Sequence, residues 1–291
     1  MLKPEVESLV PGQTFDRRSF VKTALGSAFA AAALPVTAQA IKTDFDGLTA
    51  GEVTIPSGDF KMPIYRAMPQ GKRDLPVVLV ISEIFGVHEY IADTCRRFAK
   101  QGYLAIAPEL FARQGDPTSF GTIQELQREI IAKTPDNEVL GDLDAAVAWA
   151  GANGGNTSKV GITGFCWGGR IVWLYAAHGR QLKAGVAWYG RLNGDTTPLQ
   201  PRHPIDLAAQ LKAPVLGLYG GKDTGIPLEA VDRMKAALAA ANNPAARASK
   251  FIVYPESGHA FHADYRPSYR EPDAKDGWQK CLAWFKEHGV A

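Results

Sequence analysis

Cysteine is scarce in this sequence of 291 residues, which contains only three, namely Cys95, Cys166 and Cys281. Thiols so few and so widely spaced exclude a disulfide scaffold and a zinc cluster. An excess of one sign of charge is also lacking, because 32 Lys and Arg residues stand against 30 Asp and Glu residues. Proteins that bind nucleic acid or anionic membranes carry a basic excess, so we expect neither partner.

The segment 15–40, "FDRRSFVKTALGSAFAAAALPVTAQA", has the pattern of an export signal. Basic residues come first, an Ala-rich apolar stretch follows, and the segment ends in small residues. The pair Arg17 and Arg18 resembles the twin-arginine signal of bacteria, and Ala38–Ala40 fits an A-x-A cleavage site. We therefore expect residues 1–40 to be a signal peptide recognised by the twin-arginine translocase, with the mature protein in the periplasm.

The alternative to a cleaved leader is an Ala-rich helix that anchors the protein to the membrane. Pro35, Thr37 and Gln39 interrupt the apolar run and weaken a spanning helix, so we expect no stable membrane insertion. The remaining residues, 41–291, are enough for one large α/β domain with a substantial core. We expect a single domain there.

Short apolar runs bounded by turn residues alternate with helical patterns after the leader. Buried strands are expected at 76–81, 103–107, 159–163, 183–189, 214–219 and 250–254. Helices are expected at about 89–101, 137–152, 168–178, 228–241 and 273–288. This alternation predicts an α/β fold, in which a mostly parallel twisted sheet has helices on both faces. Before it, residues 51–69 alternate apolar and polar side chains, which predicts an antiparallel hairpin at an edge of the sheet.

The stretch "VGITGFCWGGRIV", residues 160–172, places Cys166 between Gly164 and Gly168, after an apolar run and before a predicted helix. This is the arrangement of the G-x-S-x-G nucleophile elbow, in which a sharp turn from strand to helix exposes the central side chain. A thiol is a good nucleophile only as a thiolate, and the N-terminus of a helix favours that form. Cys166 is therefore the predicted nucleophile, and a buried, inert cysteine is the alternative.

Three further candidates, Glu83, Asp223 and His259, also follow predicted strands. Functional sites of parallel sheets gather at the carboxyl ends of the strands. His259 would be the general base, and Asp223 would hold its imidazole in the correct tautomer. The chain order nucleophile, acid, histidine is that of α/β-hydrolases. Taken singly, Asp223 could equally be an ordinary turn residue, and His259 could equally be an ordinary loop histidine.

Two other groups of residues could bind a metal or form a disulfide. His262 and Asp264 follow His259 in an H-x-x-H-x-D pattern, but no cysteine or carboxylate cluster accompanies them, so we expect neither a metal nor a cofactor. Cys95 and Cys281 fall on the first and last predicted helices, which pack on one face of this fold. Both a disulfide and two buried thiols remain open there.

The motifs together resemble the dienelactone hydrolase (carboxymethylenebutenolidase) family of the α/β-hydrolase superfamily. The marks are "SEIFGV" around Glu83, "YLAIAPELFARQG" leading to Arg113, "GFCWGG" around Cys166, "GGKDTGIP" around Asp223 and "GHAFHADYRPSY" after His259. Cysteine in the elbow together with Glu-Ile-Phe-Gly after the first parallel strand is fairly specific to this family. The resemblance covers about residues 51–289.

The resemblance implies site residues. Cys166, Asp223 and His259 would form the triad, and Glu83 would help to ionise the thiol when substrate arrives. The oxyanion hole would be the backbone N–H groups of Trp167 and Ile84. Further residues are expected to bind substrate: Arg113, which matches an arginine that pairs with a substrate carboxylate, Tyr189 in "WYG", and Arg266. The family's second anion-binding arginine lies four residues after the histidine, where this chain has Ala263.

The expected function is hydrolysis of a small ester or enol-lactone through a cysteinyl acyl-enzyme. A non-catalytic exported binding protein on the same fold is one alternative, because fold alone does not establish function. A thioesterase or acyltransferase of the same superfamily is another.

Overall fold

The computed structural model describes residues 40–291. The twin-arginine pair and the Ala-rich run of the expected signal peptide lie outside the described residues. Within the part that is described, no helix is both long enough and apolar enough to cross a membrane.

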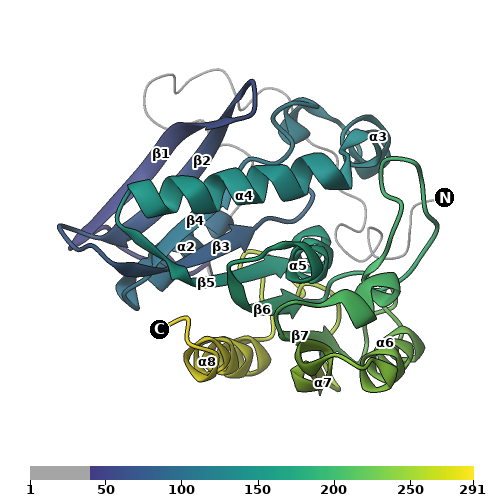
Figure 1. Ribbon diagram of the computed structural model, residues 1–291. Coiled ribbons are helices and arrows are strands. Elements are labelled where there is room, and N and C mark those ends of the chain that lie inside the picture. Colours follow the sequence, from purple (N-terminus) through teal and green to yellow (C-terminus); the bar gives the residue numbers. More distant parts are fainter. Residues whose placement is uncertain (1–39) are drawn as a thin grey trace.

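A single sheet of eight strands forms the centre of the molecule, in the order β1-β2-β4-β3-β5-β6-β7-β8 (Figure 1). The strands are β1 (Leu48–Ser57), β2 (Phe60–Pro69), β3 (Leu75–Ile81), β4 (Leu104–Pro108), β5 (Gly155–Phe165), β6 (Leu182–Trp188), β7 (Val215–Gly220) and β8 (Lys250–Tyr254). The hairpin β1–β2 is antiparallel and pairs antiparallel with β4, whereas all pairs from β4 to β8 are parallel. The predicted fold class and the edge position of the hairpin are therefore confirmed.

The main helices follow the strands as expected. They are α2 (Glu89–Lys100), α4 (Asp136–Ala152), α5 (Trp167–His178), α6 (Leu228–Ala240) and α8 (Glu271–Glu287). Five short elements were not expected from the sequence, namely η2 (Pro117–Ser119), α3 (Ile123–Glu129), η3 (Ile131–Lys133), η4 (Pro204–Gln210) and α7 (Pro244–Ala248). They lie in the connections between the main elements, and two of them contribute to the candidate site.

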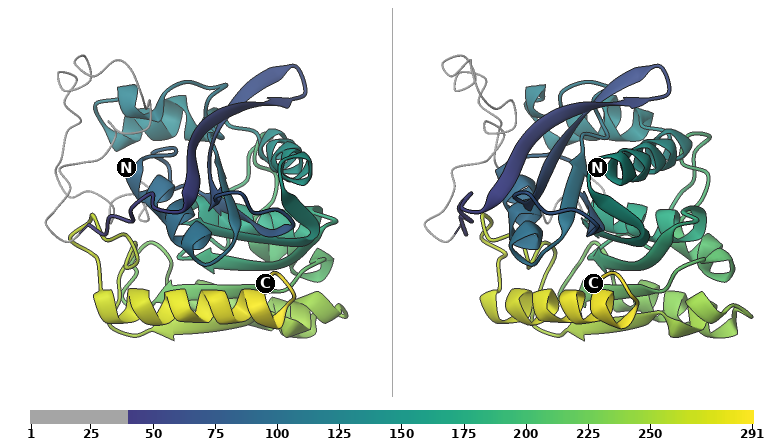
Figure 2. Two further views of the ribbon diagram at one scale, coloured as in Figure 1. Left: turned by 90° about the vertical axis from the view of Figure 1, so that its left-hand side faces the viewer. Right: turned by 60° about the vertical axis from the view of Figure 1, so that its left-hand side comes forward.

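Helices cover both faces of the sheet. Figure 1 shows α4 and α5 in front of the sheet and α2 behind it, and the turned views of Figure 2 show α8 on the side away from α4. Helices α2 and α8 pack together through Phe98 and Trp278, whose ring centroids lie 4.5 Å apart. Because both faces are covered, the buried parts of the central strands are mostly apolar, and β3 reads LPVVLVI.

The layer of α2 and α8 contains Cys95 and Cys281. Both are free thiols and fully buried, so the second of the two open alternatives holds and the disulfide is absent. Burial raises the pKa of each thiol well above its usual value, because the surroundings disfavour a thiolate. Neither is suited to nucleophilic chemistry, which leaves Cys166 as the thiol with a reactive setting.

Candidate active site

Cys166 occupies a strained turn between β5 and α5. Its backbone has φ 55° and ψ −113°, a conformation that residues other than glycine rarely adopt. The turn is held because the Cys166 amide donates to the Trp188 carbonyl (3.0 Å) and the Cys166 carbonyl accepts from the Arg170 amide (3.2 Å). The thiol thus stands at the N-terminal end of α5, where the helix dipole favours negative charge.

Two glycines make this turn sterically feasible. A Cβ added to Gly164 would collide with the Gly168 carbonyl, and one added to Gly168 would collide with the Ile81 carbonyl of the neighbouring strand. These are backbone atoms that cannot move aside. The G-F-C-W-G pattern therefore reflects the close approach of the helix to the strands, as an elbow requires.

His259 and Asp223 form a buried hydrogen-bonded pair. The Nδ1 of His259 lies 2.7 Å from Asp223 Oδ2. The other oxygen, Asp223 Oδ1, accepts from the amides of Gly225 (2.9 Å) and Ile226 (3.1 Å), which fixes the carboxylate in place. The Nε2 of His259 has no hydrogen-bond partner among the described residues and is left for a reacting group in the pocket that Cys166 also lines. The structure thus brings the predicted triad together.

The charge state of His259 is set by its neighbours. Burial disfavours the imidazolium, but the Cys166 sulfur and the Asp223 carboxylate outweigh burial and raise the pKa of His259 to about 10. The raised pKa of His259 therefore favours the imidazolium. It can act as counter-ion to a thiolate and as proton donor to a leaving group.

Glu83 lies at the end of β3 and is completely buried. Its Oε2 lies 3.2 Å from His88 Nε2, and its Oε1 accepts from the Tyr265 hydroxyl at 3.4 Å. Burial works to raise the pKa of Glu83, but hydrogen bonding and charge from His88 and the charge of Arg266 outweigh it and lower the pKa. Glu83 is therefore a buried carboxylate, a form that could accept a proton.

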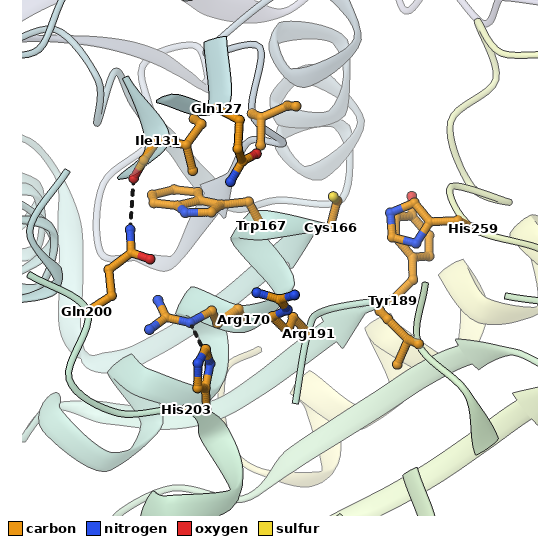
Figure 3. A pocket seen from close by; sticks show the side chains of 12 residues that line it. Gln127, Ile131, Cys166, Trp167, Arg170, Tyr189, Arg191, Gln200, His203 and His259 are labelled. Carbon is orange, nitrogen blue, oxygen red and sulfur yellow. Dashed lines mark hydrogen bonds between the residues drawn. The ribbon is translucent and has the colours of Figure 1, made fainter. Parts of the chain in front are cut away.

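The pocket over Cys166 is small. It encloses about 40 Å³ and is lined by Ile84, Gln127, Ile131, Cys166, Trp167, Arg170, Tyr189, Arg191, Gln200, His203, Ile226 and His259. Figure 3 shows Cys166 and His259 on one side of this pocket and the polar residues Gln200, Arg170 and His203 across from them. Ligand pockets are usually several hundred Å³, so a ring-shaped substrate requires the covering segments to move.

Two loop segments cover the pocket and are joined to each other. One contains α3 and η3, and the other is the loop 190–203 after β6. The Gln200 side chain donates to the carbonyls of Ile131 (2.8 Å) and Thr134 (3.3 Å), and the Asp136 amide donates to the Leu199 carbonyl (2.9 Å). These hydrogen bonds join the two segments to each other.

Arg170 forms the inner polar wall of the pocket. It donates two hydrogen bonds to Asp136, at 2.6 and 2.7 Å, and a third to the Arg202 carbonyl. His203 lies beside it, with Nδ1 3.5 Å from Arg170 Nε. The two parallel hydrogen bonds to Asp136 fix the orientation of the Arg170 guanidinium, and the Asp136 carboxylate balances its positive charge.

The polar residues that line the pocket opposite Cys166 were not expected from the sequence. A signal existed for Arg170, which lies one helical turn after Cys166, and for Arg191, which follows β6 almost directly and so stands at the carboxyl end of a parallel strand. No comparable signal existed for Gln127 or Gln200, which lie in covering segments without a motif.

A family model described as the dienelactone hydrolase family matches residues 62–289. The chain belongs to the dienelactone hydrolase family. The family assignment makes the protein a hydrolase.

Relatives share the match along their whole lengths. A candidate carboxymethylenebutenolidase of Methylorubrum extorquens is 56% identical over 289 residues, which is 99% of this chain and 98% of that protein. Another, from Escherichia coli strain K12, is 55% identical over 264 residues, 90% of this chain and 96% of that protein. A crystal structure of a candidate dienelactone hydrolase from Klebsiella pneumoniae superposes with a TM-score of 0.80 at 55% identity, covering 83% of this chain and 99% of that chain.

Besides Cys166 and His259, three residues expected from the dienelactone hydrolase resemblance line the pocket. Trp167 is the first residue of α5, so its amide is among those that the helix leaves without an intrahelical acceptor. Ile84 also lines the pocket, which agrees with an oxyanion hole made of these two amides. Tyr189 lines it as well, with its ring 5.1 Å from that of His259.

Arg113, which the dienelactone hydrolase pattern predicts to bind substrate, is not among the residues that line this pocket. Its guanidinium donates to both oxygens of Asp142, at 2.5 and 2.9 Å, and lies 4.4 Å from the centre of the Phe60 ring. Asp142 on α4 and the Ser57 carbonyl at the hairpin turn hold the side chain at the edge of the sheet. A contact of Arg113 with substrate stays a prediction.

Arg266 is not among the pocket-lining residues either. It is buried beside the pocket, where its Nε donates to the Tyr265 hydroxyl (3.0 Å) and its guanidinium stacks on Phe85. Its charge contributes to the lowered pKa of Glu83. Arg266 therefore acts on the carboxylate of Glu83, and the expectation that it binds substrate directly has no support in its position.

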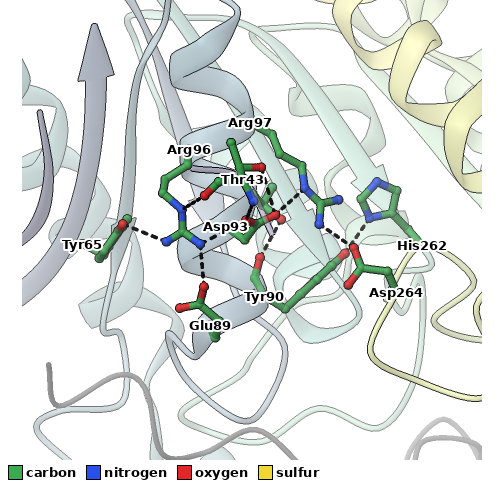
Figure 4. Close-up of polar contacts among 10 residues, drawn as sticks. Thr43, Tyr65, Glu89, Tyr90, Asp93, Arg96, Arg97, His262 and Asp264 are labelled. Carbon is green, nitrogen blue, oxygen red and sulfur yellow. Dashed lines mark hydrogen bonds and ion pairs between the residues drawn. The ribbon is translucent and has the colours of Figure 1, made fainter. Parts of the chain in front are cut away.

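The second histidine of the loop after β8 has a structural partner. His262 Nδ1 lies 2.6 Å from the Tyr90 hydroxyl, and its ring lies 4.4 Å from that of Trp188. Asp264 accepts from Arg97 at 2.5 Å (Figure 4). Both residues are thus engaged by protein groups, and they fasten the loop that carries His259 to α2.

The same network continues to the start of the described chain. Asp93 accepts from Arg97 (2.6 Å) and Arg96 (3.0 Å), and it also accepts from the Thr43 amide (2.5 Å). The Thr43 carbonyl in turn accepts from Arg96 Nε at 3.0 Å. Figure 4 shows these groups as one set of polar contacts along α2. The residues just after the expected cleavage site are therefore hydrogen-bonded to the element that supports the histidine loop.

Proposed function

We propose that this hydrolase opens a small ester or enol-lactone through a Cys166–His259–Asp223 triad and a cysteinyl acyl-enzyme. The observation that carries the proposal is the joint placement of a strained thiol and a carboxylate-oriented imidazole in one pocket. The name carboxymethylenebutenolidase, carried by the relatives, denotes an enzyme that opens an enol-lactone, which supports this substrate class.

The first half of the reaction forms the acyl-enzyme. The Cys166 thiolate adds to the carbonyl carbon, and the charge that develops on the oxygen is stabilised by the Trp167 and Ile84 amides. Collapse of the adduct breaks the bond to the ring oxygen, and protonated His259 donates its proton to that oxygen. In a lactone the released enol stays attached to the acyl group.

The second half returns the enzyme. His259, now neutral, takes a proton from water, and the resulting hydroxide equivalent attacks the thioester. The carbon–sulfur bond breaks, which leaves Cys166 again as the thiolate beside protonated His259. The product carboxylic acid releases its remaining proton to solvent and leaves as the carboxylate. Asp223 keeps Nδ1 protonated throughout, so that Nε2 faces the reacting atoms. Glu83, a carboxylate near this chemistry, would accept the thiol proton whenever Cys166 is protonated.

The decisive experiment uses an activated aryl ester such as p-nitrophenyl acetate and intact-protein mass spectrometry. The wild type is expected to give a burst of nitrophenol and an acetyl adduct on Cys166, and Cys166→Ala is expected to give neither. Cys281→Ala is the matched control, since that thiol is buried away from the pocket, and it should keep the burst. An acetyl adduct on another residue, or turnover by Cys166→Ala, would contradict the triad.

We also propose that the protein is exported by the twin-arginine route. The support is the sequence pattern of residues 15–40, with Arg17 and Arg18 before an Ala-rich run. A reporter fused after residue 45 should reach the periplasm in cells with a working twin-arginine translocase and stay in the cytoplasm in cells without it. Replacing both arginines by lysine should block export; export of the lysine version at the normal rate would disprove this route.

A further inference from the structure

His88 lies directly after the SEIFGV motif and forms a buried pair with Glu83. Its Nε2 is 3.2 Å from Glu83 Oε2, and the exposed fractions of the two residues are 2% and 0%. A carboxylate that is removed from water keeps its charge only where hydrogen bonds or opposite charge stabilise it. The proposed role of Glu83 as a proton acceptor therefore depends on the groups around it.

His88 and Arg266 supply positive charge to Glu83. Burial works to raise the pKa of Glu83, whereas His88 lowers it through both a hydrogen bond and charge, and Arg266 lowers it through charge. Three hydroxyls close enough to be affected by the Glu83 charge belong to α2, to the end of β6 and to the loop after β8. Burial raises the pKa of each and keeps it neutral; they are those of Tyr90, Tyr189 and Tyr265. His88 therefore makes the larger contribution to keeping Glu83 ionised.

The His88 ring is held in place by aromatic neighbours. Its centroid lies 5.1 Å from that of Tyr265 and 5.9 Å from that of Tyr90. The His88 carbonyl accepts from the Ile91 amide at 3.0 Å, which fixes the backbone at the start of α2. The imidazole therefore has little freedom to turn, and its Nε2 stays at the Glu83 carboxylate.

The His88–Glu83 pair lies close to the Cys166 thiol. Burial works to lower the pKa of Arg266, but negative charge on its neighbours, Glu83 and Cys166 among them, outweighs burial and raises the pKa. Tyr189, which lines the pocket together with Cys166, is also affected by both groups. Burial is the main cause of its raised pKa, and the charges of Glu83 and Cys166 add to it. Two side chains that respond to both groups place Glu83 in the neighbourhood of the sulfur.

We infer that His88 is a positioning residue that keeps Glu83 ionised and oriented, so that Glu83 can take the proton of the Cys166 thiol. The inference rests on the proposed hydrolysis at Cys166 and adds the residue on which its second base depends. In this step the S–H bond breaks and an O–H bond forms on Glu83, so the thiol becomes a thiolate and the carboxylate a neutral acid. After the product leaves, the acid returns the proton to the sulfur.

The first test follows the charge of Glu83 and needs no turnover. Infrared spectroscopy detects the C=O stretch of a protonated carboxyl group, and the band is assigned to Glu83 by its loss when Glu83→Gln is added. As the pH is lowered, this band should appear at a higher pH in His88→Leu than in the wild type, because the charged hydrogen bond no longer opposes burial. Appearance at the same pH in both proteins would overturn the inference.

The second test is the pH profile of kcat/KM for p-nitrophenyl acetate. His88→Leu should move the acid side of the profile to higher pH by about one unit, which is about a 10-fold loss at the acid end. His88→Gln keeps an N–H donor without the charge and should move it by less. His262→Leu is the matched control, since this buried histidine bonds to the Tyr90 hydroxyl (2.6 Å), and it should leave the midpoint of the profile unchanged.

A loss of kcat/KM that is uniform over the pH range in His88→Leu, or an equal shift in His262→Leu, would overturn the inference and leave the triad in place. If His88→Leu does not fold, His88→Gln decides, and no shift in either readout would refute the role of His88. A shifted infrared band in a protein that forms no acyl-enzyme on Cys166 would instead leave the dependence of Glu83 on His88 standing and refute the proposed hydrolysis.

Discussion

Two regions of the molecule contain the same kind of ion pair and use it differently. At the pocket, Arg170 forms a fork with Asp136, and at the hairpin edge Arg113 forms a fork with Asp142. Both carboxylates belong to α4. The pocket pair faces the residues around Cys166, whereas the edge pair faces the Phe60 ring. An arginine–carboxylate fork therefore does not by itself mark a functional site, and its surroundings decide its role.

The largest expected difference between the two regions is in kcat, when one carboxylate of each region is replaced by an amide. Asp223→Asn should lower kcat for an aryl ester by about 10⁴-fold with little change in KM, because the amide favours the wrong tautomer of His259. The matched change at the hairpin edge, Asp142→Asn, should leave kcat within about 3-fold. Steady-state kinetics of the two variants measure this. A comparable loss in both would mean that the hairpin edge takes part in catalysis.

The second-largest expected difference is in the free energy of unfolding that each ion pair contributes. Arg170→Ala leaves Asp136 buried without its partner and should lower the free energy of unfolding by about 3–5 kcal/mol. Arg113→Ala should lower it by only about 1–2 kcal/mol, because the side chain is 21% exposed and the Ser57 hydroxyl still donates to Asp142.

Urea denaturation provides these values. The double variant Arg170→Ala with Asp136→Ala should recover part of the loss, since it removes the unpaired charge. If the double variant were no more stable than Arg170→Ala, packing of the arginine stem would explain the loss in place of the charge.

The pH dependence of stability should reveal the residue that connects the two regions. The Glu109 amide donates to the Pro63 carbonyl of the hairpin (3.0 Å), and its carboxylate accepts from the Val87 amide (2.7 Å) in the loop that carries Glu83 and Ile84. Burial raises the pKa of Glu109 to about 7. A raised pKa in the folded state means that the stabilising contribution is full below the unfolded pKa of about 4.3 and is lost as the pH rises through about 7.

Glu109→Gln keeps the acceptor for Val87 without the charge. Relative to this variant, the wild type should lose about 3 kcal/mol of unfolding free energy between pH 4.5 and 7.5, measured by urea denaturation at several pH values. Parallel stability curves for the two proteins over that range would show that Glu109 is ionised throughout.

The smallest expected effect concerns the cover of the pocket. Gln200→Ala removes both hydrogen bonds from this side chain to the α3–η3 segment. Because the closed pocket encloses only about 40 Å³, easier opening should raise kcat/KM for bulky esters by about 3-fold while that for acetate esters hardly changes. A uniform change for all esters would indicate an effect on chemistry and not on access.

The regular part of the fold could be predicted because the sequence signals are local. All six parallel strands lie within about two residues of their expected positions at their carboxyl ends, since each is an apolar run closed by turn residues. The short helix α3 was missed because IQELQRE has seven residues and only two buried apolar side chains. Its position depends on packing over the pocket, which no local pattern encodes.

Site residues could be predicted from the sequence where the end of a strand fixes their position. They could not be predicted where a partner side chain from another part of the chain fixes it. Cys166, Asp223 and His259 meet because parallel strands end at one edge of the sheet. Arg113 also follows a strand, but Asp142 from a distant part of the chain draws its side chain to the hairpin. Arg191 satisfied the strand-end rule and could have been found by applying the rule to β6 as well.

The hydrogen bonds of Thr43 set a practical limit on shortening the protein for expression. A recombinant chain that begins at residue 41 keeps both the Thr43 amide on Asp93 and the Thr43 carbonyl on Arg96. One that begins a few residues later loses both, and the polar groups of α2 that hold the histidine loop through Arg97 and Asp264 then lose their outer partner. The first strand starts only at Leu48, so a boundary chosen from secondary structure alone would remove a segment that supports the loop with His259.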